Sequence, residues 1–209
     1  MRKGFTLIEL IFSMVIIAIA FTVLPKILQL STKASTQSIR EEAMFSAVAL
    51  LGLIKATAWD EKNSEYDDIL LVNNGNAAYE CNNNGYRVGG FLGSRNCEHK
   101  VKASTLGADS GEPPYDDLDD FTTVNANNYN SSRSYKLSVK VDFVEDLSLN
   151  DEVFKDENFI TPNSTNTKYI VIDVNSTKKT ELLRKNIARF VFHSFNIGQT
   201  HINRLSWYE

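Results

Sequence analysis

Hydrophobic residues form one unbroken run near the start of the chain. From Leu10 to Pro25 no acidic, basic or histidine residue occurs. At 1.5 Å per residue, the roughly 20 residues from Phe5 to Leu24 make about 30 Å of helix, which is the thickness of one bilayer core. The pattern therefore predicts a transmembrane helix half over residues 5–25.

The hydrophobic spacing changes after Pro25 but stays helical. Apolar residues now recur every three to five positions, which is typical of a helix with one apolar face. They are Ile27, Leu28, Leu30, Ala34, Ile39, Ala43, Met44, Ala47, Val48, Leu51, Ile54 and Ala58. Pro25 removes one backbone hydrogen bond and should bend the helix where it leaves the membrane. We expect one long, kinked helix from Phe5 to about Thr57, with an amphipathic half over residues 26–58.

A period of two marks the last third of the chain. Apolar and polar residues alternate from Tyr135 to Phe143, and residues 168–174 and 187–195 are two further apolar segments. The polar residues 175–179 predict a turn, so the last two segments should form a hairpin. Three such strands make an antiparallel sheet with one face against the helix stripe. We therefore expect an α+β fold in which residues 59–209 form a globular, β-rich domain.

Charged residues at the N-terminus orient the helix. Arg2 and Lys3 precede it, and cations are enriched on the cytoplasmic side of membrane helices, so the C-terminal domain should be exported. Glu9 lies inside the apolar segment, where a carboxylate costs on the order of 2.5–3.5 kcal/mol at mid-membrane and less near an edge. Two interpretations stay open, because Glu9 either contacts water at the boundary or meets a partner in the membrane plane.

The N-terminal residues together resemble a known processing site. Gly4–Glu9, which follows a short basic leader and opens an apolar helix, is similar to that site in type IV prepilins and type II secretion pseudopilins. The resemblance implies that residues 1–4 are a leader peptide and that prepilin peptidase cuts after Gly4 and methylates the new terminus at Phe5. It also implies that Glu9 pairs with the terminal amine of a neighbouring subunit, and that the chain has a type IV pilin-like fold.

An ordinary secretory signal is the competing interpretation of this segment. Ala18-Ile19-Ala20 is similar to the small-residue cleavage site of such signals. Against it, the apolar run continues to Leu24, and Glu9 stands where the hydrophobic core of a secretory signal is normally uncharged. The prepilin interpretation is therefore preferred.

The two cysteines, Cys81 and Cys97, lie outside the membrane segment. In a Gram-negative cell the exported part lies in the oxidising periplasm, where disulfides persist. We expect Cys81 and Cys97 to be bridged, with two free thiols as the alternative.

An acidic stretch follows Pro113-Pro114. Its four carboxylates within five residues offer hard oxygen ligands to Ca²⁺, although their spacing is not that of an EF-hand. They are Asp116, Asp117, Asp119 and Asp120. The alternative is a solvated acidic turn, and no other metal or cofactor is expected. The stretch also resembles the acidic, aromatic-flanked segment of minor pilins of the PilV and mannose-sensitive-haemagglutinin kind.

The sequence contains no recognisable catalytic arrangement. His99, His193 and His201 are scattered without metal-ligand spacing, and no nucleophile–base motif or phosphate-binding glycine loop occurs. The net charge is −4, which disfavours nucleic acid as a partner. These features argue against an enzyme.

These observations favour a minor pilin or pseudopilin that assembles through its N-terminal helix. The implied partners are prepilin peptidase, other pilins or pseudopilins and an inner-membrane assembly platform. The expected location is the bacterial inner membrane in a single pass, with the N-terminus cytoplasmic and the C-terminal domain periplasmic, or a surface fibre. The alternative is a membrane-tethered periplasmic binding module for adhesion, DNA or a secretion substrate.

Overall fold

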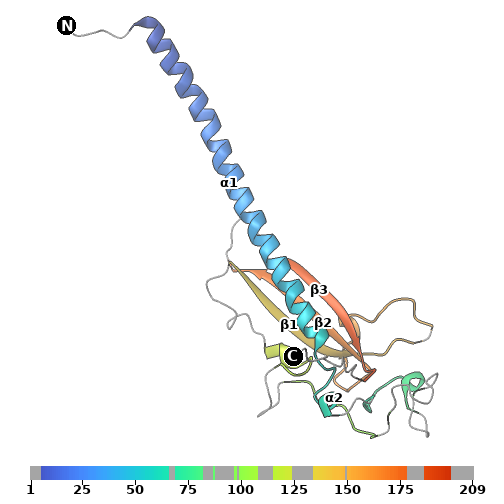
Figure 1. Ribbon diagram of the computed structural model, residues 1–209. Coiled ribbons are helices and arrows are strands. Elements are labelled where there is room, and N and C mark those ends of the chain that lie inside the picture. Colours follow the sequence, from blue (N-terminus) through green and yellow to red (C-terminus); the bar gives the residue numbers. More distant parts are fainter. Residues whose placement is uncertain are drawn as a thin grey trace, which may run out of the picture.

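The computed structural model places one long helix on a small antiparallel sheet (Figure 1). It describes residues 6–65, 69–81, 87, 97, 99–107, 115–123, 134–148, 150–177 and 186–198. The helices are α1 (Leu7–Ala56) and α2 (Lys62–Glu65), with 3-10 turns η1 (Ala77–Tyr79), η2 (Asp120–Thr123) and η3 (Glu157–Phe159). The strands are β1 (Tyr135–Val144), β2 (Thr167–Ser176) and β3 (Asn186–Phe195). This is the expected α+β, type IV pilin-like architecture.

Helix α1 is continuous over 50 residues and has two different environments. It runs through Pro25 without interruption and ends where Thr57 turns extended and its hydroxyl donates to Ile54 O at 2.8 Å. Only the second half contacts the sheet, through a stripe of buried residues one helical turn apart. The stripe consists of Ala43, Ala47, Leu50 and Ile54. Small alanines in this stripe let the helix approach the sheet closely.

The sheet has the order β1-β2-β3, and both strand pairs are antiparallel. Val139 pairs with Ile172, which pairs with Phe190, so these residues share one face of the sheet. That face forms the core against α1. Tyr135 fixes the contact further, because its hydroxyl lies 2.7 Å from Ser46 Oγ on α1. The three strands agree with the sequence prediction, except that β2 extends through Ser176 into the expected turn.

The irregular segment after α2 is held to the sheet by polar contacts. The side-chain amide of Asn196 accepts from Leu70 N at 3.0 Å and donates to Leu70 O at 2.7 Å, as a neighbouring strand would. The apolar residues 69–72 do not form a strand, because Leu71 makes only an isolated bridge with Lys102. The Asn196 side chain thus supplies the hydrogen bonds that the buried backbone N–H and C=O of Leu70 would otherwise make to a neighbouring strand.

Candidate functional site

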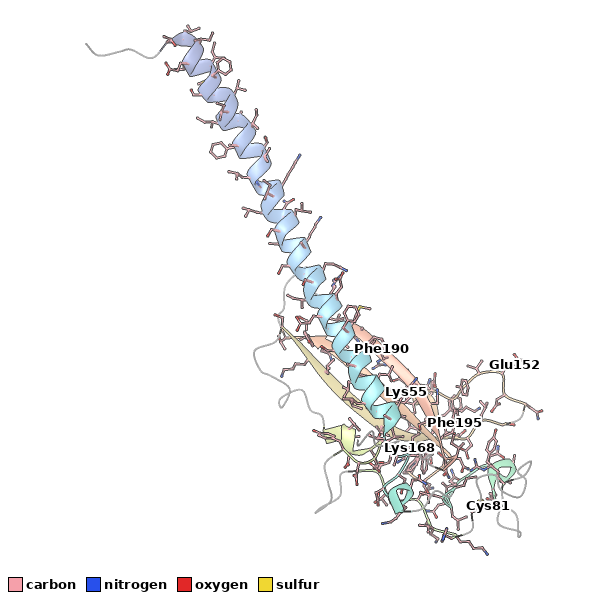
Figure 2. The ribbon with its side chains drawn as sticks, in the orientation of Figure 1. Lys55, Cys81, Glu152, Lys168, Phe190 and Phe195 are labelled. Carbon is pink, nitrogen blue, oxygen red and sulfur yellow. A yellow bond between two sulfur atoms is a disulfide. The ribbon has the colours of Figure 1, made fainter. Side chains whose placement is uncertain are left out.

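The first half of α1 is an uncovered apolar surface. Every large hydrophobic side chain from Leu7 to Leu30 is at least 44% exposed, and Figure 2 shows this half projecting away from the domain. Among the described residues, α1 is the one helix long and apolar enough to cross a membrane, and its most apolar window has no buried residue. The length and exposure fit a single-pass membrane anchor.

Glu9 lies in the first turn of this apolar surface. Its side chain is exposed, and its Oε2 accepts from Thr6 Oγ1 at 3.5 Å. A carboxylate near a helix N-terminus is stabilised by the helix dipole. The predicted processing residues Gly4 and Phe5 lie outside the described residues.

The apolar surface of α1 continues alongside the domain. Four large side chains on the second half of α1 remain between 47% and 75% exposed. They are Met44, Phe45, Val48 and Leu53, and they alternate along the helix with the buried stripe that contacts the sheet. The domain therefore covers one face of the helix and leaves a second apolar face open.

The disulfide between Cys81 and Cys97 is present in the structure, with the two Cα atoms 6.2 Å apart. Cys81 also forms an antiparallel bridge with Arg87. The Arg87 guanidinium donates to Asn196 O and to Asn166 Oδ1, both at 2.9 Å, and burial lowers its pKa. These hydrogen bonds attach Arg87 to the residues that flank β2 and β3.

The acidic stretch is a hydrogen-bonded turn. Asp117 Oδ1 accepts from the backbone N–H groups of Asp119 and Asp120 at 3.0 and 3.1 Å. Asp120 Oδ2 accepts from those of Tyr115 and Asp116 at 3.0 and 3.2 Å. Across the described part of the chain, no group of three or more His, Cys, Asp or Glu side chains is arranged to hold a metal ion. Because these oxygens cap the turn, the geometry gives the calcium hypothesis no support, and it stays an untested prediction.

Comparison with known protein families identifies the N-terminal segment. Residues 1–25 match the family model of the prokaryotic N-terminal methylation motif. This is a prepilin-type motif. No curated protein and no solved structure matches the chain. The methylation motif thus covers residues 1–4, Glu9 and most of the uncovered apolar surface in the first half of α1.

His193 is packed between side chains on the sheet face opposite α1. Its ring centroid lies 5.0 Å from that of Phe154 and 5.3 Å from that of Tyr169. Its Nε2 lies 2.7 Å from Lys155 O, a contact that ties the segment before η3 to β3. His193 therefore has a structural environment, while His201 lies outside the described residues.

Sequence reasoning missed a buried ionic site at the C-terminal end of α1, where Figure 2 labels Lys168. Lys168 Nζ donates to Asp119 Oδ1 at 2.5 Å and to Trp59 O at 2.6 Å. Gly107 N donates to Asp119 Oδ2 at 2.8 Å. The available signal was the alternation in β2, since Lys168 occupies the same inward face as Ile170.

The topology explains how this buried site forms. Ala58 bridges to Asp117, which brings the acidic stretch against the end of α1. Lys168 pairs in register with Phe143, whose ring lies 6.1 Å from the ring of Trp59. Burial is the largest cause that raises the pKa of Asp117 to about 8, and the nearby Asp119 carboxylate acts in the same direction.

Proposed function

We propose that this chain is a minor pilin or pseudopilin, a structural subunit of a type IV pilus-like or type II secretion filament. The observation that carries the proposal is the methylation motif joined to an apolar helix half that the chain's own domain leaves uncovered. Each large hydrophobic side chain gains roughly 1.5–3 kcal/mol on full burial. A run of such residues is therefore stable in lipid or against other helices, and poorly stable in water.

The proposed mechanism is assembly through α1. Prepilin peptidase removes residues 1–4 and methylates Phe5. The helix then remains in the inner membrane, with the domain in the periplasm. An assembly platform then moves the helix into a bundle of pilin or pseudopilin helices. The proposed function of the protein is to pack its helix into a filament, and this function involves no catalytic step.

Glu9 supplies the specific contact in this assembly. Leu10 to Pro25 contains no cation, so the carboxylate has no partner further along its own membrane helix. A carboxylate and an ammonium in lipid each cost less when paired. The terminal amine of Phe5 in a neighbouring subunit is such a partner once the leader is removed. The pairing is supported by the position of Glu9 in the first helical turn, four residues after Phe5 in the sequence.

The exposed face of the second half of α1 extends the proposed interface beyond the membrane. Phe45 is 75% exposed and lies on the helix where the domain begins. Large exposed apolar side chains grouped on one face are typical of interaction surfaces. The acidic, aromatic-flanked stretch from Tyr115 to Phe121 supports a place among minor pilins of the PilV or mannose-sensitive-haemagglutinin kind.

The experiment compares filament incorporation of wild type and Glu9→Leu at equal expression. Because Glu9 lies far from the folded domain, Glu9→Leu should insert and fold normally while its share in sheared fibres falls at least tenfold, a loss of about 1.4 kcal/mol in equilibrium terms. Ile8→Leu, a neighbouring change that keeps the charge, is the matched control and should incorporate normally. Equal incorporation of Glu9→Leu and wild type would refute the pairing.

A further inference from the structure

Three ionisable side chains are buried together where α1, the acidic stretch and the sheet meet. Lys168, Asp119 and Asp117 are only 1%, 2% and 4% exposed. Lysine and aspartate are almost never buried this deeply unless they are paired. Filament assembly through α1 makes no use of this cluster, because it lies inside the domain.

Burying these ionisable groups is energetically unfavourable if their only role is to pack the core. Replacing a buried ion pair by apolar residues of similar volume is often neutral or stabilising. The neighbouring inward positions of β2, Ile170 and Ile172, are such apolar residues and are fully buried. A lysine in this row points to a chemical use for its amino group.

We propose that Lys168 and Asp119 become joined by an amide bond between their side chains. The neutral amine of Lys168 attacks the carboxyl carbon of Asp119, so that one C–N bond forms and one C–O bond breaks. The carboxyl hydroxyl leaves with one amine proton as water. Asp117 relays protons to the departing oxygen and is regenerated. The reaction needs no oxidant, reductant or second substrate.

The reacting groups are held in contact and shielded from water. Lys168 Nζ and Asp119 Oδ1 are 2.5 Å apart, and a fixed contact of this kind converts a slow bimolecular condensation into a fast intramolecular one. Nζ lies 4.6 Å from the ring centroid of Trp59 and 5.6 Å from that of Phe143. In the proposed reaction, one proton moves across this contact from Lys168 Nζ to Asp119, which gives the neutral amine and the neutral acid that react.

Asp117 is adjacent to this contact, because its carboxyl group interacts with that of Asp119 and with the amine of Lys168. Burial and the adjacent Asp119 raise its pKa to about 8, so Asp117 is largely a neutral acid at physiological pH. General acid catalysis is most effective when the pKa of the acid is close to the operating pH. The Gly107 N–H, 2.8 Å from Asp119 Oδ2, faces the oxygen on which negative charge develops during attack.

The product fits the surrounding hydrogen-bond partners better than the ion pair does. Within the described residues, two oxygen atoms accept from Lys168 Nζ, whereas an ammonium has three N–H bonds. The amide has one N–H, and Trp59 O at 2.6 Å accepts it. Its carbonyl oxygen is the former Asp119 Oδ2, which already accepts from Gly107 N. The bond would close a loop between residues 49 apart and attach the acidic stretch to β2 covalently.

The test is the intact mass of the full chain, extracted from membranes in detergent, reduced and denatured. The expected result is a mass lower than that of the processed sequence by one water molecule. Protease digestion should release one joined peptide pair that contains Asp119 and Lys168. Lys168→Met and Asp117→Ala should each restore the full mass. Lys140→Met is the matched control and should keep the deficit, because Lys140 is an exposed lysine paired with Asp142 at 2.7 Å.

Two results would overturn the proposal. One is a wild-type chain, shown to be folded by circular dichroism, that has the full mass and yields the two peptides separately. The other is a mass deficit that persists in Lys168→Met, since it would then belong to a different bond. The wild-type peptide pair decides the question by itself if a variant fails to fold. Neither result bears on filament incorporation, which depends on Glu9 and α1.

Discussion

The carboxyl group of Asp117 makes the stability of the domain depend on pH. Its pKa rises from an ordinary 3.8 to about 8, with burial as the largest cause and Asp119 as the next. The folded protein therefore binds more protons than the unfolded chain between these values. This contribution to stability is complete below pH 3.8 and is lost as the pH rises through about 8.

Thermal unfolding of the full chain in detergent checks this effect. The melting temperature of wild type should fall between pH 5 and pH 8.5, an interval over which most of this contribution to stability is lost. Asp117→Asn, which is neutral at every pH, should fall less over the same interval. Parallel curves for the two proteins would show that Asp117 titrates normally in the folded state.

We predict that the N-terminus is processed between Gly4 and Phe5. The methylation motif over residues 1–25 predicts that the mature chain begins at Phe5 and carries one added methyl group on its amine. Mass spectrometry of the purified N-terminal peptide measures both features. A mature chain that begins at Met1, or at Phe21 after Ala18-Ile19-Ala20, would falsify this prediction and favour another targeting signal.

Adjacent residues in the second half of α1 lie on different faces of the helix, one buried and one exposed. Ala47 is fully buried against the sheet, whereas Val48 is half exposed. Adding three carbon atoms at position 47 overpacks the core and should lower the free energy of unfolding by about 1–3 kcal/mol. Val48→Leu is the matched control and should stay within about 0.5 kcal/mol of wild type. Urea unfolding of Ala47→Leu and Val48→Leu measures the difference, and equal losses would show that the helix is rotated differently.

Cys81 and Cys97 lie outside the three strands of the sheet. A bridge between residues 16 apart stabilises by about 3 kcal/mol in the chain-entropy model. The double variant Cys81→Ser/Cys97→Ser should lose about that free energy of unfolding. Neither thiol should react with an alkylating reagent in unreduced protein from the periplasm, and full alkylation of both would disprove the bridge there.

At the scale of the whole molecule, local periodicity explains which parts of the fold were predictable. Helix α1 and strand β1 repeat apolar residues with periods of 3.6 and two, and β2 and β3 are short apolar segments, so all four are visible without any tertiary contact. The apolar residues 69–72 form no regular strand ladder, because Asn196, which lies 126 positions from Leu70 in the sequence, takes the place of a strand partner. Such contacts leave no local pattern.

The same difference applies to Glu9 and to the buried cluster around Lys168. Glu9 could be recognised as unusual from the sequence alone, because a charge within an apolar run is conspicuous. The cluster of Lys168, Asp119 and Trp59 was not, because its members come from β2, the acidic stretch and the end of α1. The four aspartates suggested a calcium site from composition, whereas side-chain oxygens of Asp117, Asp119 and Asp120 accept from backbone N–H groups, and Asp119 also accepts from Lys168.

The central claim is that the uncovered half of α1 packs against the helices of other pilin or pseudopilin subunits. The most direct measurement places a photo-crosslinking amino acid at Phe21, which is 75% exposed, and identifies the adducts formed in living cells. Val153, equally exposed but in the domain, is the control position. The account predicts that Phe21 crosslinks to the N-terminal helix of another such subunit and that Glu9→Leu reduces this product. Adducts of a correctly processed chain with lipid alone, and with no pilin helix, would contradict it.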